Sequence, residues 1–273
     1  MKNYTISVII PMYNSELTIE RCILSVFAQD YKSSLEIIIS DDGSSDNSVS
    51  IVENIIKNNN TGIDIYLIKQ RNSGVSSARN AAIKIARNDL IALLDSDDAW
   101  FTNKLSRQIY FLNEYKIDFI GSILSNKPWN WYLFRRVNII FRITLVDLMF
   151  KFCFQPSTVL FKKEIIAKVG LFNEEFKYAE EGEFFMRILN AGFKCYLLNE
   201  KLTIFGYDNK HGFGDGGLSG NLKEMNKGEI RNHRYAFDNF NINFCTYFFA
   251  RIFSYIKYIR RLMIVKIKKS KLC

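Results

Sequence analysis

The sequence has 273 residues, of which 48% are hydrophobic, 24% charged and 15% aromatic. This composition is that of a globular protein and excludes the disordered, collagen-like and low-complexity classes. The length suits one α/β domain with appendages and can bury a sizeable core. The five cysteines are scattered and form no C-x-x-C motif. We therefore expect neither a disulfide framework nor a thiolate zinc site. The cysteines fit a protein of a reducing compartment.

The net charge of +9 is concentrated at the end of the chain. Residues 239–273 contain no Asp or Glu. Their cations are Arg251, Lys257, Arg260, Arg261, Lys266, Lys268, Lys269 and Lys271. The remainder of the chain is nearly neutral, so a basic tail, and not a basic protein, needs an explanation.

The N-terminal apolar run does not resemble a signal peptide, because Pro11 and Asn14 interrupt it and no small-residue cleavage site follows. No run of 18 apolar residues occurs anywhere, so we expect no ordinary transmembrane helix.

Residues 1–100 alternate between strand and helix patterns. Apolar runs predict strands over 5–12, 35–40, 63–69 and 89–94, and helical periodicity predicts helices over 15–29, 46–56 and 74–87, the first with Ser15 as its N-cap. This alternation predicts an α/β fold with a parallel sheet covered by helices on both faces. Right-handed crossovers bring the carboxyl ends of the strands to one edge, where such sheets bind ligands. Polar clusters follow each predicted strand, so we expect the site at that edge.

The pattern is less regular after residue 98. Gln155–Lys162 is typical of another strand followed by a short helix from Lys163, and Glu180–Asn190 of a helix. His211–Asn221 contains five glycines and predicts a loop. Trp129–Phe152 mixes aromatic residues with arginines.

Three acidic residues, Asp95, Asp97 and Asp98, follow the fourth predicted strand. Carboxylates one residue apart can share Mg²⁺ or Mn²⁺ and leave coordination positions open for phosphate oxygens. A solvated turn that caps the next helix is the alternative. The other polar clusters at the same edge favour the metal site.

Two further segments allow two interpretations each. Asp41–Asp46 (DDGSSD) could be a turn in which Ser45 or Asp46 caps the next helix, or it could offer a carboxylate to a base or ribose. Arg79 lies one turn from the start of its helix, where a cation opposes the helix dipole. It is expected to have an anionic partner, either a ligand or a nearby acid.

The sequence lacks the motifs of several enzyme classes. The sequence contains no G-x-G-x-x-G after the first strand, no P-loop, no H-E-x-x-H and no G-x-S-x-G, and it has only two histidines. Dinucleotide-binding, P-loop and triad-hydrolase functions are therefore poorly supported.

Four segments together resemble the family 2 glycosyltransferases. They are SVIIPMYN (7–14), DDGSSDNS (41–48), NSGVSSARN (72–80) and LLDSDD (93–98). The resemblance implies the GT-A fold, with a mostly parallel central sheet, and a nucleotide-diphosphate sugar as donor, for which we expect a UDP-sugar. It also implies roles for particular residues. The nucleoside pocket would be lined by Pro11, Tyr13, Asn14 and Asp42. The metal ion on the diphosphate, Mn²⁺ or Mg²⁺, would be held by Asp95 and Asp97, with Asp98 as a possible substitute, and Arg79 would neutralise the departing diphosphate.

Residues 179–187 (AEEGEFFMR) resemble a second family motif, E-D-x-x-x-x-x-R, with Glu181 where the family has Asp. The resemblance makes Glu181 the catalytic base, with Glu180 and Glu183 as alternatives. An exposed helix face without a catalytic role remains open. His211 is either a metal or diphosphate contact or an ordinary loop residue, and Gly216–Ser219 resembles a segment that closes over the donor.

The implied mechanism is a single in-line displacement. Glu181 removes the proton of an acceptor hydroxyl, which attacks the anomeric carbon and inverts its configuration. No covalent sugar–enzyme intermediate is required.

We divide the chain into a glycosyltransferase domain, 1–238, and a basic amphipathic tail, 239–273. Within the domain, 1–98 is the nucleotide-binding half and 99–238 the acceptor-binding half. The tail intersperses aromatic and aliphatic residues with cations, which is typical of a helix lying on anionic lipid, although a core-covering helix with a cationic outer face would look similar. We expect a peripheral protein on the cytoplasmic face of the membrane, with a lipid-linked glycan of bacterial surface polysaccharide synthesis as acceptor.

Two other functions remain open. A nucleic-acid-binding protein could use the tail against phosphates, but the tail is rich in aliphatic residues and the expected site is acidic, so we expect no nucleic-acid partner. A sugar nucleotidyltransferase shares the α/β core and an acidic metal site. Such enzymes have a glycine-rich basic loop after the first strand, and Met12–Ser15 is not one.

Overall fold

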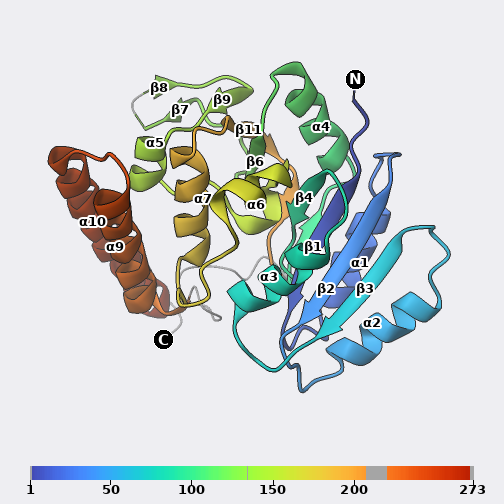
Figure 1. Ribbon diagram of the computed structural model, residues 1–273. Helices are drawn as coiled ribbons and strands as arrows, with labels where there is room; N and C mark the ends of the chain where they lie inside the picture. The colour runs from blue at the N-terminus through green and yellow to red at the C-terminus, as the bar shows by residue number, and fades with distance from the viewer. Residues whose placement is uncertain (1, 134, 207–219, 271–273) are drawn as a thin grey trace.

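A computed structural model describes residues 2–133, 135–206 and 220–270 of the chain, with a mostly parallel eight-stranded sheet at its centre (Figure 1). The strand order is β3-β2-β1-β4-β10-β6-β11-β9, and β10 and β9 run antiparallel to their neighbours. The strands are β1 Ile6–Met12, β2 Leu35–Asp41, β3 Asp64–Lys69, β4 Leu90–Leu93, β6 Phe119–Ile123, β9 Ile140–Arg142, β10 Leu160–Lys162 and β11 Cys195–Lys201. Two short pairs complete the sheets: β5 Ala99–Trp100 with β12 Thr203–Ile204, and β7 Trp131–Tyr132 with β8 Arg135–Arg136.

Helices cover both faces of the sheet. They are α1 Ile19–Phe27, α2 Ser48–Lys57, α3 Val75–Ile85, α4 Lys104–Glu114, α5 Leu145–Phe150, α6 Glu164–Val169, α7 Glu180–Asn190, α9 Leu222–Asn239 and α10 Phe244–Ser270. Buried residues of α1, α2 and α4 share one core with Val8 and Ile10, and those of α3, α6 and α7 share another with Ile9. Alternate residues of β1 thus feed two cores, which explains why the strand is apolar throughout.

The strands and helices of the first hundred residues occur where the sequence predicts them, with one wrong start. Helix α1 begins at Ile19, and Ser15 is not its N-cap. Residues 15–18 form a turn in which the Ser15 carbonyl accepts from the N–H groups of Thr18 (3.0 Å) and Ile19 (2.9 Å). The Ser15 hydroxyl is used elsewhere, because it lies 2.8 Å from the hydroxyl of Ser96.

The strand expected over 155–162 is only partly present. Pro156–Thr158 form a 3₁₀ turn, and only Leu160–Lys162 pair with β4 and β6. Pro156 has no N–H to give to a sheet ladder, and the Thr158 N–H donates to the Gln155 carbonyl at 2.9 Å. The short helix expected from Lys163 is α6.

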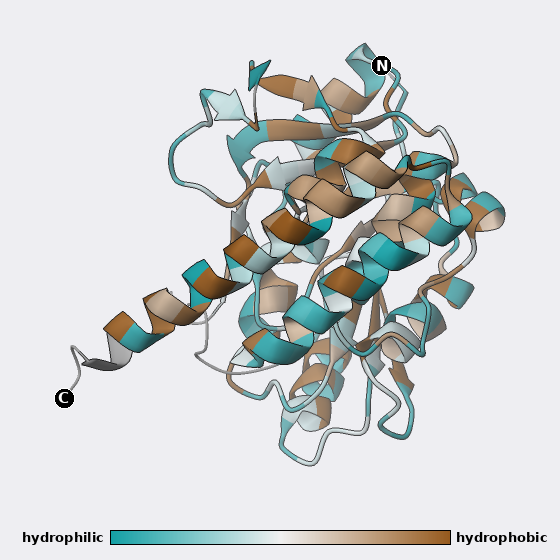
Figure 2. Ribbon diagram, turned by 90° about the vertical axis from the view of Figure 1, so that its left-hand side faces the viewer, coloured by the Kyte–Doolittle hydropathy of each residue, from teal (hydrophilic) through white to brown (hydrophobic). Residues whose placement is uncertain are grey.

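The C-terminal residues form a helical hairpin against the domain. Helix α9 packs on α7, and α10 packs on α9 and α5. The Phe237 and Tyr247 rings stack at 4.5 Å, and the buried Asn226 side chain donates to the Ser254 hydroxyl at 3.2 Å. The far end of α10 extends beyond the body of the molecule (Figure 2). Within the three described ranges, no helix has the length and apolar character needed to cross a membrane.

Candidate active site

A cavity of about 850 Å³ opens where β1, β2 and β4 end. Eight of the site residues predicted from the sequence line it, namely Pro11, Tyr13, Asn14, Asp42, Arg79, Asp95, Asp97 and Glu181. The structure therefore brings the predicted set together, while the role of each residue stays a prediction. Another cavity, of about 660 Å³, lies at the opposite edge of the sheet near Tyr4 and Asp89, and none of the predicted residues lines it.

Asp42 organises the loop that follows β3. Its Oδ1 accepts from the Gln70 side chain (2.7 Å) and the Ser73 N–H (2.8 Å), and its Oδ2 accepts from the Gly74 N–H (2.8 Å). A carboxylate has about four lone-pair sites, so one remains for a donor in the cavity. Gly43 makes this arrangement possible, because its φ is +81° and a Cβ there would lie 3.0 Å from the Asn72 nitrogen.

Neither Ser45 nor Asp46 is the N-cap of α2, because the N-cap is Asn47 and its side chain makes no cap hydrogen bond. The contact of a carboxylate with a base or ribose stays a prediction. The Asp46 carboxylate accepts from the Ser48 N–H at 3.0 Å, at the start of α2, whereas Asp42 faces the cavity. Asn14 ties this segment to β1, because its side-chain oxygen accepts from the Ser45 N–H at 2.8 Å. Its own φ is +48°, a conformation that Asn tolerates better than most residues.

Tyr13 stands at the cavity wall with 51% of its surface exposed. An aromatic ring that is exposed beside a cavity offers a face on which a nucleobase can stack. Its position suits the nucleoside contact expected from the sequence.

Asp95 and Asp97 line the cavity on a segment that is held from both sides. The Asp95 N–H donates to the Ser157 hydroxyl (2.9 Å), and the Asp97 carbonyl accepts from Arg21 (2.7 Å). Among the residues that the structure describes, no group of three or more His, Cys, Asp or Glu could enclose a metal ion. Mg²⁺ or Mn²⁺ bound through one or two carboxylates and phosphate oxygens needs no such group, so this pair fits the ion.

Asp98 is not the expected substitute for these two acids. It is buried, it does not line the cavity, and its Oδ1 accepts from the Gly206 N–H at 2.8 Å. Burial, together with the carboxylates of Asp95 and Asp97, raises the pKa of Asp98 to about 8. A carboxyl group that is mostly protonated at neutral pH is a poor metal ligand.

Arg79 joins two acidic segments at the cavity. Its guanidinium lies 2.7 Å from Asp95 and 3.1 Å from Glu180, and it is almost fully buried. Burial alone would lower the pKa of Arg79, but these carboxylates outweigh it and raise the pKa. The anionic partner expected for this cation therefore includes two acids of the protein itself.

The three glutamates at the start of α7 have different surroundings. Glu183 is buried, does not line the cavity, and pairs with Arg187 at 2.6 Å. Glu180 lines the cavity but is paired with Arg79. Glu181 also lines the cavity, and burial and the Glu180 carboxylate raise its pKa to about 8, against the opposing effect of Arg79. Glu181 is thus the glutamate best placed to take up a proton near neutral pH.

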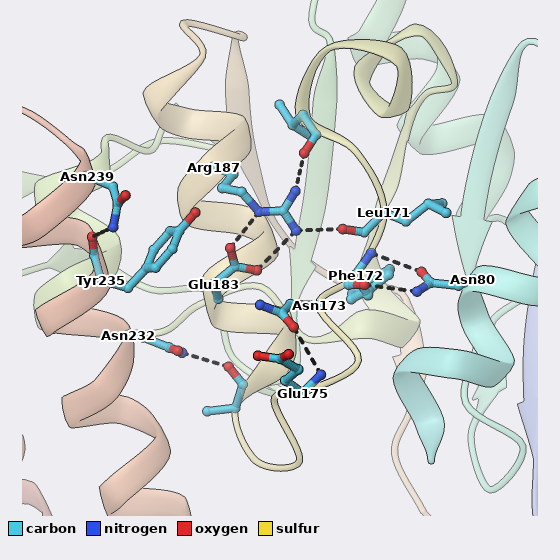
Figure 3. A network of polar contacts seen from close by, with 12 residues as sticks. Asn80, Leu171, Phe172, Asn173, Glu175, Glu183, Arg187, Asn232, Tyr235 and Asn239 are labelled. Carbon is cyan, nitrogen blue, oxygen red and sulfur yellow. Dashed lines mark hydrogen bonds and ion pairs between the residues drawn. The ribbon is translucent and has the colours of Figure 1, made fainter. Parts of the chain in front are cut away.

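A polar network holds the loop that leads into α7 (Figure 3). Arg187 donates to the Leu171 carbonyl at 2.6 Å and also to the Val169 carbonyl. The Asn80 side chain exchanges hydrogen bonds of 2.9 Å with the N–H and carbonyl of Phe172. These partners of the loop could not be identified from the sequence.

Helix α9 supports the same loop from the other side, which sequence reasoning missed. The Arg231 side chain donates to the Tyr178 carbonyl (2.8 Å) and the Asn232 side chain to the Ala179 carbonyl (2.6 Å). Ala179 has a left-handed backbone with φ +54°, which is unusual for a residue other than Gly. A Cβ on Gly228 would lie 2.5 Å from the Tyr178 carbonyl oxygen, so the contact requires glycine.

Two sequence predictions fall outside the described residues. His211 and Gly216–Ser219 belong to residues 207–219, and their predicted contacts stay predictions.

The chain has relatives of known type. Residues 7–170, more than half of it, match the family described as glycosyl transferase family 2. It is 35% identical over 207 residues to UDP-Glc:alpha-D-GlcNAc-diphosphoundecaprenol beta-1,3-glucosyltransferase WfaP of Escherichia coli, which covers 71% of this chain and 74% of the relative. It is 32% identical over 204 residues to GalNAc(5)-diNAcBac-PP-undecaprenol beta-1,3-glucosyltransferase of Campylobacter jejuni, which covers 73% of this chain and 64% of the relative.

Solved structures share its architecture at low identity. The mannosyltransferase PcManGT from Pyrobaculum calidifontis, in complex with GDP-Man and Mn²⁺, has a TM-score of 0.73 at 17% identity and covers 96% of this chain and 73% of its own. TarS of S. aureus, in complex with UDP-GlcNAc, has a TM-score of 0.70 at 20% identity and covers 94% of this chain and 72% of its own. The GT-A fold expected from the sequence is confirmed. The chain therefore belongs to glycosyl transferase family 2 and is a glycosyltransferase.

Proposed function

We propose that this glycosyltransferase moves a sugar from a nucleotide-diphosphate sugar, a UDP-sugar in the first instance, to a hydroxyl of a lipid-linked glycan, with inversion at the anomeric carbon. One observation carries the proposal. Arg79 ties the acidic segment after β4 to the acidic start of α7 at one cavity, so a diphosphate site and a general base lie within reach of one sugar.

The donor fits the cavity in size and chemistry. A volume of about 850 Å³ is in the range of pockets that bury small ligands. Tyr13 offers a face on which the base can stack, and Asp42 has a lone pair left to accept a hydrogen bond from the nucleoside. Pro11 and Asn14 form the adjoining wall. Asp95 and Asp97 would hold Mn²⁺ or Mg²⁺, which supplies positive charge for the diphosphate when bound. Arg79 adds its own charge beside them.

The base is Glu181. Its carboxylate takes the proton of the acceptor hydroxyl while that oxygen bonds to the anomeric carbon and the bond from carbon to the diphosphate oxygen breaks. The reaction is a single displacement, and the sugar leaves with inverted configuration. Glu has one methylene more than the usual Asp, which moves the carboxylate by about one bond length.

The acceptor is inferred from the relatives. According to their names, the Escherichia coli and Campylobacter jejuni enzymes act on glycans that are linked to undecaprenol through a diphosphate. We extend this acceptor class to the present chain, in bacterial surface polysaccharide synthesis, with the enzyme peripheral on the cytoplasmic face of the membrane and without a nucleic-acid partner. Membership of a glycosyltransferase family disfavours the sugar nucleotidyltransferase alternative.

Donor binding is tested by thermal unfolding with UDP-, GDP- and dTDP-sugars, each with Mn²⁺ or with EDTA. A donor at 100 times its Kd is expected to raise the Tm by roughly 5 °C, and the shift should vanish with EDTA or in Asp97→Ala. Asp64→Ala removes an exposed carboxylate at the far edge of the sheet and should keep the shift. An equal shift in Asp97→Ala, or no shift with any nucleotide sugar, would contradict the donor site.

The stereochemistry is tested separately. Proton NMR of the product formed from an α-linked donor should show a β-linkage at first appearance. An α-linked product would rule out the single displacement.

A further inference from the structure

Helix α10 has one face that packs on the protein. Tyr247, Ala250 and Ser254 are buried against α9 and the domain. The Lys257 ammonium donates to the Phe150 carbonyl at 3.0 Å and pairs with Glu229, which Arg261 also approaches, at 3.8 Å. The inward cations of the helix are therefore matched by an acid of α9.

The opposite face is apolar and exposed in the part of the helix that the structure describes. Six residues at spacings of three or four form a continuous row along it, each at least 37% exposed. This row, here named the outer strip, consists of Phe248, Ile252, Ile256, Ile259, Met263 and Ile267. Among the residues that the structure describes, eleven of the twenty-two exposed large hydrophobic residues lie on α10. An apolar surface of this extent usually marks an interaction site.

The charge beside the outer strip indicates what covers it. Arg260 and Lys266 are exposed next to it and form no ion pair in the part of the chain that the structure describes. The sequence has no Asp or Glu from 239 to 273. If a second copy of the chain packed its outer strip against this one, the cations of the two helices would come together without an acid between them. Anionic headgroups supply the missing charge, and the acyl boundary beneath them takes the apolar side chains.

The position of the outer strip relates it to the cavity. Met225, near the start of α9, lines the cavity. Helix α10 runs antiparallel to α9, with Tyr247 on Phe237 and Ser254 on Asn226, so its later turns lie toward the start of α9. We propose that the outer strip, with Arg260 and Lys266, docks in the plane of an anionic membrane and places the cavity beside that membrane. The further step, that the membrane then delivers a lipid-linked acceptor to the cavity, rests on the proposed function.

The test is co-sedimentation of the full chain with vesicles of phosphatidylglycerol and phosphatidylcholine, compared with phosphatidylcholine alone. The wild type should bind the anionic vesicles and lose binding as salt rises. Ile256→Glu/Met263→Glu should weaken binding by roughly tenfold or more, because two anchors become anions. Arg260→Gln/Lys266→Gln should weaken it by about fivefold for each charge removed.

A matched control carries the same chemical change elsewhere. Leu24→Glu/Ile85→Glu replaces two exposed apolar residues of α1 and α3, with an equal change in net charge, and should bind like the wild type. Circular dichroism verifies that each variant is folded. Equal weakening in this control, or equal binding to neutral vesicles, would overturn the proposal.

Two further measurements separate the competing explanations. A dimer in analytical ultracentrifugation that Ile256→Glu/Met263→Glu abolishes, or salt-sensitive binding to RNA without binding to anionic vesicles, would overturn membrane docking. Activity on a short-chain, water-soluble acceptor should survive in Ile256→Glu/Met263→Glu. If vesicles bind as expected but no nucleotide sugar is used, the proposed function fails and docking stands. If transfer occurs without vesicle binding, docking fails and the proposed function stands.

Discussion

Glu181 illustrates how two neighbouring carboxyl groups acquire different properties. Glu180 is neutralised by Arg79 at 3.1 Å, whereas Glu181 is left with a half-buried carboxyl beside that of Glu180. Its pKa of about 8 places the change of charge close to the pH at which enzymes of this kind work. The sequence motif alone left three glutamates open, and the ion pairs distinguish them.

Replacing Glu181 tests the base. Glu181→Gln should lower kcat by roughly 10²- to 10⁴-fold and leave donor binding intact, since the amide cannot take up a proton. Because the base must be ionised, kcat/KM of the wild type should rise with pH and level off above about 8. Initial rates from pH 6 to 9.5 measure both. Glu175→Gln, on the preceding loop, is the control, and a larger loss in Glu180→Gln than in Glu181→Gln would assign the base to Glu180.

At this scale the site could largely be predicted, because its motifs are local. Asp42 follows β2, and Asp95 and Asp97 follow β4. Both strands pair in parallel with β1, so the convergence of the three acids follows from topology. The sequence could not show that Asp98 lies outside the cavity and accepts from the Gly206 N–H, because Gly206 is more than a hundred residues away. The pairing of Arg79 with Glu180 depends likewise on a contact between distant segments.

The elements around α7 show how distant helices position an active site. The loop before α7 is held by α3 through Asn80, by α7 itself through Arg187, and by α9 through Asn232. Asn232 bonds the carbonyl of Ala179, the residue with the left-handed backbone. Polar side chains in the middle of α9 follow no local motif, so the sequence could not have identified them.

Asn232→Ala tests this support. The Ala179 carbonyl keeps only the Gly182 N–H donor, at 3.1 Å, when the 2.6 Å bond is lost. We therefore expect kcat to fall about tenfold with the donor KM unchanged, and the free energy of unfolding to fall by about 0.5–1.5 kcal/mol. Asn239→Ala removes an exposed bond to the Tyr235 carbonyl on the same helix and should change neither. Steady-state kinetics and urea unfolding measure the effects. Reduced stability with an unchanged kcat would show that Asn232 has a structural role only.

The elements themselves were predictable to different degrees. Alternating strands and helices over residues 1–100 have short-range periodicity, and they occur as predicted. The order of β10, β6, β11 and β9 arises from pairings between distant segments, two of them antiparallel, and periodicity carries no information on these. The hairpin of α9 and α10 depends on contacts with α5 and α7 that the tail sequence does not reveal.

Over the whole molecule, the hairpin is joined to the domain by a buried histidine. The Nε2 of His233 in α9 lies 2.9 Å from the Met149 carbonyl of α5. Burial is the main cause that lowers the pKa of His233 to about 4. The ring is therefore neutral in the folded protein at physiological pH.

The stability of the molecule should fall in acid because of this residue. The folded pKa lies below the unfolded value of about 6.5, so the stabilisation is present above pH 6.5 and is lost as pH falls through 4. The loss from pH 7 to pH 4 should be roughly 3 kcal/mol. His233→Gln keeps a donor that does not titrate, and its unfolding free energy should depend less on pH by that amount. Parallel dependence of wild type and variant in urea titrations would contradict this role.

The burial of Arg79 has a consequence for how such enzymes can be recombined. The cation belongs to the first half of the sequence, but one of the acids that neutralise it belongs to the second. Breaking a buried ion pair by removing one partner costs about 3–5 kcal/mol. A chimera that joins residues 1–98 to the second half of a relative without an acid at the position of Glu180 would leave Arg79 with Asp95 alone, and this penalty is the upper limit of its cost. Residues 1–98 therefore cannot be combined with the second half of every relative. Chimeras that exchange acceptor specificity should keep an acid at the position of Glu180.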